Sequence, residues 1–446
     1  MKIPATPPDL GELLVEATKD DPSFLIGARP VDDRGRYLHW DEMLHRQPPE
    51  GLSHQRWWLS TAFARRSMAR ELPLIGTNGR PFRFSNVDAV QQLVHLIDQQ
   101  AGGQILADEV VTNLRSSNRY LVSSLIEEAI TSSQLEGAST TRRVAKELLQ
   151  TGRAPRGRSE QMIVNNFRAM QVAQEIADRP LDVDTVLGLH ETVTAGALDD
   201  PADAGRIQGM DEERIALFWP QDNTLLHRPP PADQLPDRLQ GMCAFANGQE
   251  VDGFIHPVVR AIIVHFWLAY DHPFVDGNGR TARALFYRSM LNEGYWLTQY
   301  LSISSILKKA PAKYAKSYLY SETDDNDITY FVIYQLQVIK RAIDSLHDYL
   351  RRKIEETRDI EVLISSSPHL NHRQITIVGE ALRDPGEPFT ITAQQRRHGV
   401  TYQSARTDLL GLESLELLTK HRIGKKFVFR AAPDLLERLR AIGSGS

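Results

Sequence analysis

The sequence predicts a mainly α-helical protein with a small β-hairpin in its middle, an N-terminal accessory region and a C-terminal winged helix-turn-helix domain. Apolar residues recur at helical spacing in most windows from about residue 108 to residue 356. Two short strand-like pieces flank a turn signal near residues 218–231, where a proline run closes the unit. Residues 370–432 then change to short helices followed by a strand-like hairpin, the order of a winged helix.

Length and composition place the chain among ordinary folded proteins. It has 446 residues, of which 41% are hydrophobic and 24% charged, which excludes collagen-like, disordered and disulfide-stapled classes. The net charge of −5 excludes a polycation that coats nucleic acid. A single cysteine, Cys243, permits neither an internal disulfide nor a cysteine zinc site, so we expect a cytoplasmic protein. The longest apolar run, 261–270, has about half the length of a membrane span, so we expect a buried core helix and no membrane association.

Three parts follow one another along the chain. Residues 1–107 mix proline- and glycine-rich loops with an apolar stretch and short strand-like pieces, and we expect an accessory region there. Residues 108–356 form the predicted helical core, which includes an amphipathic helix over about 118–137. Residues 360–442 form the predicted winged helix-turn-helix domain.

The C-terminal part carries a basic surface that the net charge of the whole chain conceals. Between residues 390 and 430, eight basic residues stand against three acidic ones, a local net charge of +5. The basic residues are Arg396, Arg397, Arg406, Lys420, Arg422, Lys425, Lys426 and Arg430. This charge is typical of a domain that contacts DNA, although a solvated face of an oligomerising or peptide-binding domain has a similar composition. DNA contact and a homodimer are both compatible with this sequence.

A glycine-rich turn at the start of a predicted helix has the features of an anion site. Gly277 and Gly279 flank Asn278, and glycine lets the backbone turn tightly and approach a ligand closely. The helix that follows directs its free N–H groups and its positive dipole end toward this turn. The turn is therefore predicted to bind phosphate.

Charged side chains around this turn complete the predicted phosphate site. Arg280 and Arg283 lie on one face of the first helical turn, where the helix dipole disfavours cations, so a bound polyphosphate is expected to compensate them. Asp276 would repel phosphate unless a divalent cation lay between them, which predicts Mg²⁺ at this carboxylate. His272 has the chemistry of a general base for an attacking hydroxyl.

The segment 272–283 resembles the signature of the Fic (filamentation induced by cAMP) family, H-P-F-x-[DE]-G-N-G-R-x-x-R, and matches it at every defined position. The resemblance covers roughly residues 115–350 and implies an α-helical Fic core. It also implies transfer of AMP from ATP, with Mg²⁺, to a Ser, Thr or Tyr hydroxyl of a target protein. By this resemblance His272 is the base, Asp276 the metal ligand, and the phosphates contact Gly277, Asn278, Gly279, Arg280 and Arg283.

The predicted hairpin is the expected docking flap for the target protein. By resemblance to the Fic core, it holds the target segment in an extended conformation beside the α-phosphate. The flap residues are Asp222, Asn223, Thr224, Leu225, Leu226 and His227.

A second short motif upstream predicts that the enzyme inhibits itself. Glu136 lies in the last turn of the helix predicted near residues 118–137, where the dipole disfavours an anion, and Gly137 fits the position that ends the helix. The run from Ser132 to Gly137 resembles the inhibitory motif [ST]-x-x-x-E-[GN] of Fic proteins. The resemblance implies that Glu136 pairs with Arg283 and leaves ATP only an unproductive pose.

Other functions stay open at this point. The same site could transfer UMP or a phosphate, or could remove AMP with Glu136 positioning a water molecule. A function of another class is a DNA-binding regulator whose core senses a nucleotide. A metal hydrolase built on His256, His265 and His272 is disfavoured, because the sequence contains no H-E-x-x-H motif.

Overall fold

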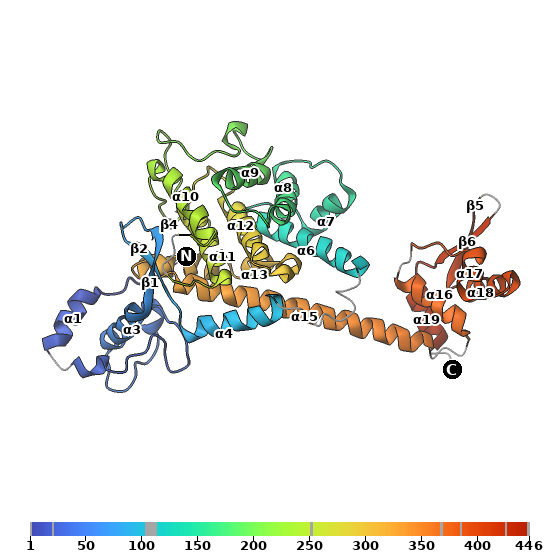
Figure 1. Cartoon of the computed structure of the whole chain (residues 1–446), viewed down its shortest axis with the longest axis horizontal. Helices are drawn as coiled ribbons and strands as arrows, with labels where there is room; N and C mark the ends of the chain where they lie inside the picture. Colours follow the sequence, from blue (N-terminus) through green and yellow to red (C-terminus); the bar gives the residue numbers. More distant parts are fainter. Residues whose placement is uncertain are drawn as a thin grey trace. The chain divides into compact units, whose positions relative to one another are not determined.

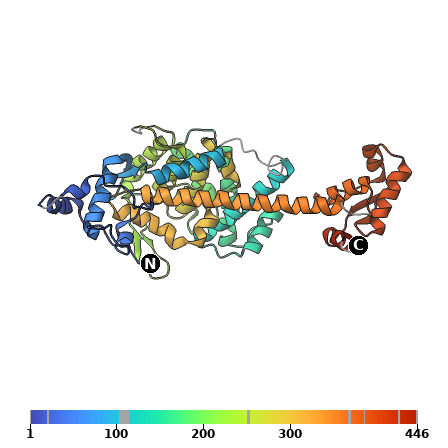
Figure 2. The same ribbon diagram turned by 90° about the horizontal axis from the view of Figure 1, so that it is seen from below.

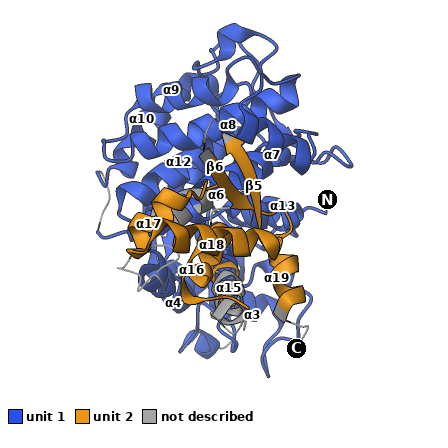
Figure 3. Ribbon diagram, turned by 90° about the vertical axis from the view of Figure 1, so that its right-hand side faces the viewer, with its two compact units in different colours: residues 1–346 blue, residues 347–446 orange. Residues whose placement is uncertain are grey.

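The computed structural model describes residues 2–19, 22–102, 114–249, 253–365, 369–383, 386–423 and 426–443. The described chain is mostly helical, with three small antiparallel strand pairs, and this confirms the predicted fold class (Figure 1). It divides into two compact units, Met1–Leu346 and His347–Ser446, which Figure 3 colours separately. Within the described ranges, no helix is both long and apolar enough to cross a membrane.

The N-terminal part of the first unit packs against the helical core. Buried Arg65 donates a hydrogen bond of 2.6 Å to the hydroxyl of Tyr330, and the Arg83 amide donates to the Asn326 carbonyl at 2.8 Å. The predicted boundary at residues 107 and 108 lies outside the described residues. The elements of this part are α1 (Leu10–Lys19), η1 (Pro22–Leu25), α2 (Trp40–Met43), α3 (His54–Met68), β1 (Ala69–Ile75), β2 (Pro81–Ser85), α4 (Asp88–Ile97) and η2 (Asp98–Gly102).

The helical core is built around α11 (Pro257–Asp271), which is buried on almost every face. Its apolar run is therefore the core helix that the sequence predicts. Pro257 opens the helix at a position where no backbone N–H is needed, and the next helix, α12 (Asn278–Asn292), packs directly on it. Around this pair lie α6 (Leu114–Leu135), α7 (Arg142–Thr151), α8 (Arg158–Glu175), α9 (Val183–Thr194), η3 (Pro201–Asp203), η4 (Ala232–Gln234), α10 (Leu235–Ala246), η5 (Trp296–Tyr300), α13 (Ile303–Lys309) and α14 (Pro311–Thr323).

Two further elements of the core match the sequence prediction. The predicted hairpin is present as β3 (Leu217–Phe218) paired antiparallel with β4 (Leu225–His227). The helical spacing expected up to residue 356 is seen in α15 (Thr329–Ser365), whose first half runs along the bundle of the first unit (Figure 2). Val332, Leu336 and Ile339 of this half are buried, at helical spacing.

The second unit has its own small hydrophobic core, formed by three helices, a hairpin and a terminal helix. Phe389 pairs with Phe429 through two backbone hydrogen bonds of 2.8 Å, which adds a short strand to the edge of the hairpin. Short helices followed by a hairpin are the order that the sequence predicts for this part, whereas the terminal helix was not predicted. The elements are α16 (His372–Arg383), α17 (Ile391–His398), α18 (Tyr402–Ser414), β5 (Leu418–Ile423), β6 (Lys426–Ala431) and α19 (Leu435–Gly443).

Candidate active site

The loop between α11 and α12 begins with a strained residue that is held from outside. His272 has a φ of 47°, a left-handed conformation that costs a residue other than glycine about 1 kcal/mol. The guanidinium of Arg214 donates to the carbonyl oxygens of Asp271, at 2.6 Å, and of His272, at 3.0 Å. It also donates to the Pro230 carbonyl at 2.7 Å, so the same side chain ties the loop to the end of the flap.

The imidazole of His272 is in the state that a general base requires. Its Nδ1 lies 3.3 Å from the carbonyl oxygen of Ala269, and a proton donated there leaves the lone pair on Nε2. Burial lowers the pKa of His272 to about 4, so the ring is neutral at pH 7. A neutral imidazole with a free Nε2 is competent to accept a proton from a hydroxyl.

The glycines of the predicted phosphate site lie where no larger residue fits. A Cβ on Gly277, whose φ is 85°, would stand 2.7 Å from Cγ2 of Thr194 on α9. A Cβ on Gly279 would stand 2.8 Å from the carboxyl carbon of Glu136. The side chain of Asn278 is buried and bonds both the amide and the carbonyl of Phe274, at 2.9 and 2.8 Å. Asn278 thus closes the loop with its side chain and offers a ligand only its backbone.

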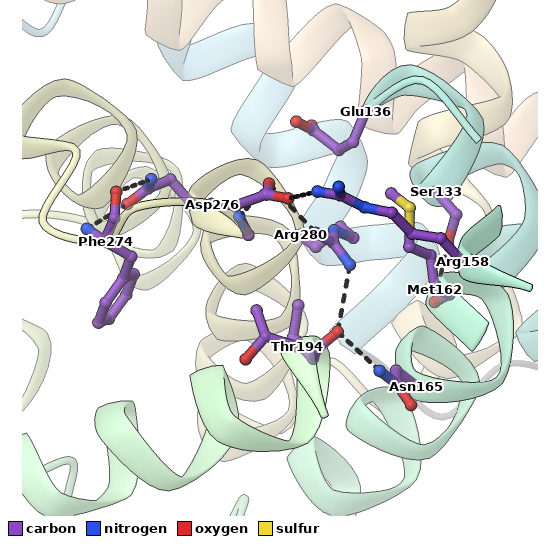
Figure 4. Close-up of polar contacts among 12 residues, drawn as sticks. Ser133, Glu136, Arg158, Met162, Asn165, Thr194, Phe274, Asp276 and Arg280 are labelled. Carbon is purple, nitrogen blue, oxygen red and sulfur yellow. Dashed lines mark hydrogen bonds and ion pairs between the residues drawn. The ribbon is translucent and has the colours of Figure 1, made fainter. Parts of the chain in front are cut away.

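The two arginines of the predicted site are both buried but have different partners. Arg280 is 0% exposed, donates to the carbonyl of Val193 at 3.1 Å and lies 3.3 Å from Asp276 (Figure 4). Arg283 is 1% exposed and donates from Nε to the hydroxyl of Ser132 at 2.8 Å. Each guanidinium is already held in place without a ligand, so binding of a phosphate would cost less side-chain conformational entropy.

Asp276 is surrounded by positive charge. Its Oδ1 accepts from the Gly277 amide and lies near Arg280, while its Oδ2 lies 3.0 Å from a guanidinium nitrogen of Arg158. Burial raises the pKa of Asp276, but Arg280, the Gly277 amide and Arg158 outweigh it, and the net pKa is lowered. The carboxylate is therefore ionised, as a metal ligand must be.

This environment fits a magnesium ion that takes most of its ligands from a nucleotide. Asp276 supplies one carboxylate, and the positively charged guanidinium of Arg158 already lies against its Oδ2. Among the residues that the structure describes, no three His, Cys, Asp or Glu side chains gather as a metal cage. Mg²⁺ commonly binds through one or two carboxylates together with phosphate oxygens and water, so this donor set is sufficient.

The predicted inhibitory motif lies directly against the phosphate site. Helix α6 starts at Leu114, earlier than expected, and ends at Leu135, so Glu136 follows the last turn and Gly137 turns the chain with a φ of 90°. The carboxylate of Glu136 lies 2.8 Å from a guanidinium nitrogen of Arg283, whose side chain is 2% exposed. The same carboxylate covers Gly279, as the close approach at that glycine shows.

The flap has an exposed tip and an anchored end. Asp222 accepts from the amide of Thr224 at 3.1 Å, and Asn223 adopts a φ of 54°, a turn conformation that asparagine tolerates. Leu225 is 39% exposed, whereas His227 is buried, with its Nε2 2.7 Å from the Tyr270 carbonyl. His227 therefore anchors the flap to the core, and the predicted docking residues open to a partner are those nearer the tip.

Sequence reasoning missed three residues that hold this site together. His190 of α9 stacks on Phe274 with ring centroids 3.7 Å apart, and its Nε2 lies 2.9 Å from the carbonyl oxygen of Asp276. Arg158 and Arg214 contact the loop from α8 and from the segment before the flap. None of the three belongs to a local motif, and only their long-range contacts reveal them.

Comparison with known proteins agrees with this geometry. Residues 180–290 match the family model described as Fic/DOC family. The chain is 32% identical over 115 residues to the protein adenylyltransferase fic-1 of Caenorhabditis elegans, covering 26% of this chain and 20% of that protein. It is 26% identical over 175 residues to the protein adenylyltransferase Fic of Nematostella vectensis, covering 37% of each. The matched region thus spans well under half of these relatives.

A solved structure supports the fold. A Fic family protein from Desulfovibrio desulfuricans G20 superposes with a TM-score of 0.53 at 19% sequence identity, covering 78% of this chain and 97% of that one. This likeness concerns the fold alone, while the family model covers the segment that carries the loop and both arginines. The chain therefore contains a Fic/DOC family domain, at residues 180–290.

Proposed function

We propose that this protein is an adenylyltransferase that transfers AMP from ATP to a Ser, Thr or Tyr hydroxyl of a target protein. The observation that carries the proposal is the loop of α11 and α12, where neutral His272 stands beside a glycine turn and two buried arginines. Its relatives named protein adenylyltransferase support the same reaction. Phosphoryl-type transfer depends mostly on positioning and charge neutralisation, which these groups supply.

In the proposed reaction, Nε2 of His272 accepts the proton of the target hydroxyl as its oxygen attacks the α-phosphorus of ATP. The bond to the β-phosphate oxygen breaks, and pyrophosphate leaves. Arg280 and the N-terminal amides of α12 neutralise negative charge on the phosphates. Asp276 would hold Mg²⁺, which when bound would supply positive charge against the phosphates.

We also propose that Glu136 inhibits this reaction. Its carboxylate pairs with Arg283 and covers Gly279, so it stands where the terminal phosphate of ATP would otherwise bind. Arg283 keeps Ser132 as a second partner, at 2.8 Å from its Nε, and so remains in position when the glutamate is removed. Inhibition therefore requires only that the carboxylate occupies the site.

Intact-mass measurement of a modified target tests which group is transferred. We expect the Glu136→Gly variant, incubated with ATP, Mg²⁺ and cell lysate, to add the mass of AMP to a target protein. Addition of only a phosphate, or preference for UTP with addition of UMP, would replace adenylylation by the corresponding transfer. Loss of label from a target modified beforehand would instead identify removal of AMP.

A second proposed activity is DNA contact by the unit His347–Ser446. The exposed residues Tyr402, Gln403, Arg406 and Thr407 lie on one face of α18, opposite the buried face that includes Leu409. In a helix-turn-helix, the N-terminal part of the second helix contacts base edges in the major groove, and this face has the polar side chains for it.

The lone, buried and unbonded Cys243 also suits the reducing cytoplasm in which we place the protein.

Salt-dependent binding to duplex DNA checks this second activity. The guanidinium of Arg406 is exposed and makes no ion pair within the described ranges. Arg406→Gln is expected to weaken binding of labelled duplex DNA by about threefold to tenfold and to reduce the salt slope by about one. Arg397→Gln is the matched control, because Glu380 already pairs with that guanidinium, which donates to it at 2.6 Å. Equal affinity of the wild type and Arg406→Gln for duplex DNA would show that α18 is not the helix that contacts DNA.

A further inference from the structure

Arg158 stands at the place where a cation is needed on Asp276. It is the first residue of α8, and its guanidinium lies 3.0 Å from Oδ2 of Asp276 (Figure 4). The same guanidinium lies 3.0 Å from Oδ1 of Asp199. The side chain is 50% exposed, and that of Asp199 is 95% exposed. Arg158 therefore approaches the phosphate site from its solvent side and is not locked by packing.

Arg280 is the other arginine that contacts Asp276, and it is held there more firmly than Arg158. It is fully buried and donates to the carbonyl of Val193, so its position is fixed by the core. Within the part of the chain that the structure describes, Arg158 has no such backbone partner, and Asp199 is its second ion-pair partner. Of the two counter-charges, only that of Arg158 can be exchanged without leaving a buried group unpaired.

The position of Arg158 on its helix weakens its hold further. A guanidinium at the first residue of a helix faces the positive end of the dipole, which disfavours it. Ion pairs with half-exposed partners contribute little, because water and salt screen them. Arg158 is thus weakly held against an ionised carboxylate.

We propose that Arg158 is the exchangeable counter-ion of Asp276, a positioning residue that must leave Oδ2 before a divalent cation can bind there. The guanidinium neutralises the carboxylate in the metal-free protein and lowers its affinity for the metal. When the cation enters with a nucleotide, Arg158 remains on Asp199 at the edge of the site. The inference rests on the proposed function only in using Asp276 as the metal ligand.

Titration of the nucleotide-free, full-length protein with Mn²⁺, followed by electron paramagnetic resonance of the free ion, tests this inference. Arg158→Gln is expected to bind Mn²⁺ about fivefold more tightly than the wild type, since the competing charge is gone. Arg158→Lys keeps the charge and is expected to stay within about twofold of the wild type. Arg156→Gln removes an exposed positive charge two residues away whose side chain makes no hydrogen bond or ion pair in the described chain, and the affinity of this variant is expected to be unchanged.

The double variant Arg158→Gln, Asp276→Asn separates local competition from a general change in charge. It is expected to lose the whole gain, because the gain depends on the carboxylate. Equal binding by Arg158→Gln and the wild type would overturn the inference, as would a gain that persists without Asp276 or that appears equally in Arg156→Gln. AMP transfer is not part of the readout, so a failure of the proposed function leaves this result separate.

Discussion

Replacing His272 by asparagine is expected to lower AMP transfer by about 100-fold or more, because the variant lacks the group that accepts the proton of the attacking hydroxyl. Asparagine is the informative choice, since it tolerates the left-handed backbone that residue 272 adopts, at a φ of 47°. His272→Ala would add backbone strain to the lost base. Incorporation of labelled AMP into the target, measured in the Glu136→Gly background, gives the rate.

Nucleotide affinity and pH dependence distinguish a lost base from a damaged site. The variant is expected to bind ATP nearly as well as its parent, because His272 contacts Ala269 and not the glycine turn. In the parent, the pKa of His272 is about 4, so its imidazole stays unprotonated as the pH falls from 8 to 6. We therefore expect no decrease in kcat/KM from protonation of this base in that pH range. Undiminished transfer by His272→Asn would remove His272 from the mechanism.

The arrangement of the candidate site was predictable because most of its residues lie within one short segment, 272–283. The order of His272, Asp276, two glycines and two arginines fixes a loop and the first turn of a helix, and local sequence determines both. The helix-dipole argument marked Glu136 and Arg283 each as a charge without a local partner. That the two pair with each other was implied by the resemblance to the Fic inhibitory motif and not by the dipole argument.

The supporting contacts were not predictable in the same way. His190, Arg158 and Arg214 reach the loop from other segments, and nothing in their own neighbourhoods distinguishes them from ordinary helix or surface residues. The spacing of Phe274 and Asn278 likewise gave no sign that the amide closes the loop. The residue types within a motif can be read from the sequence. Whether a given side chain binds the ligand or instead holds the loop in place depends on tertiary packing.

Replacing Glu136 by glycine is expected to raise AMP incorporation about tenfold or more, because it uncovers Gly279 and returns one nitrogen of Arg283 to the phosphates. The same change removes the charged partner of a buried guanidinium, which costs about 1–3 kcal/mol of stability in the absence of ligand. ATP supplies the missing anion, so it should raise the melting temperature of the variant more than that of the wild type.

Two matched variants locate the effect at the phosphate site. Glu127→Gln removes a carboxylate from α6, the helix that precedes Glu136, where Glu127 pairs with exposed Arg142, and is expected to change neither rate nor ATP response. Glu136→Gln keeps a side chain over Gly279 without its charge and should fall between the wild type and the glycine variant. If incorporation and the ATP-induced stabilisation were the same in Glu136→Gly and the wild type, the ion pair of Glu136 with Arg283 would be structural only. An increase in both, absent from Glu127→Gln, would show that a single carboxylate competes with the terminal phosphate for one buried guanidinium.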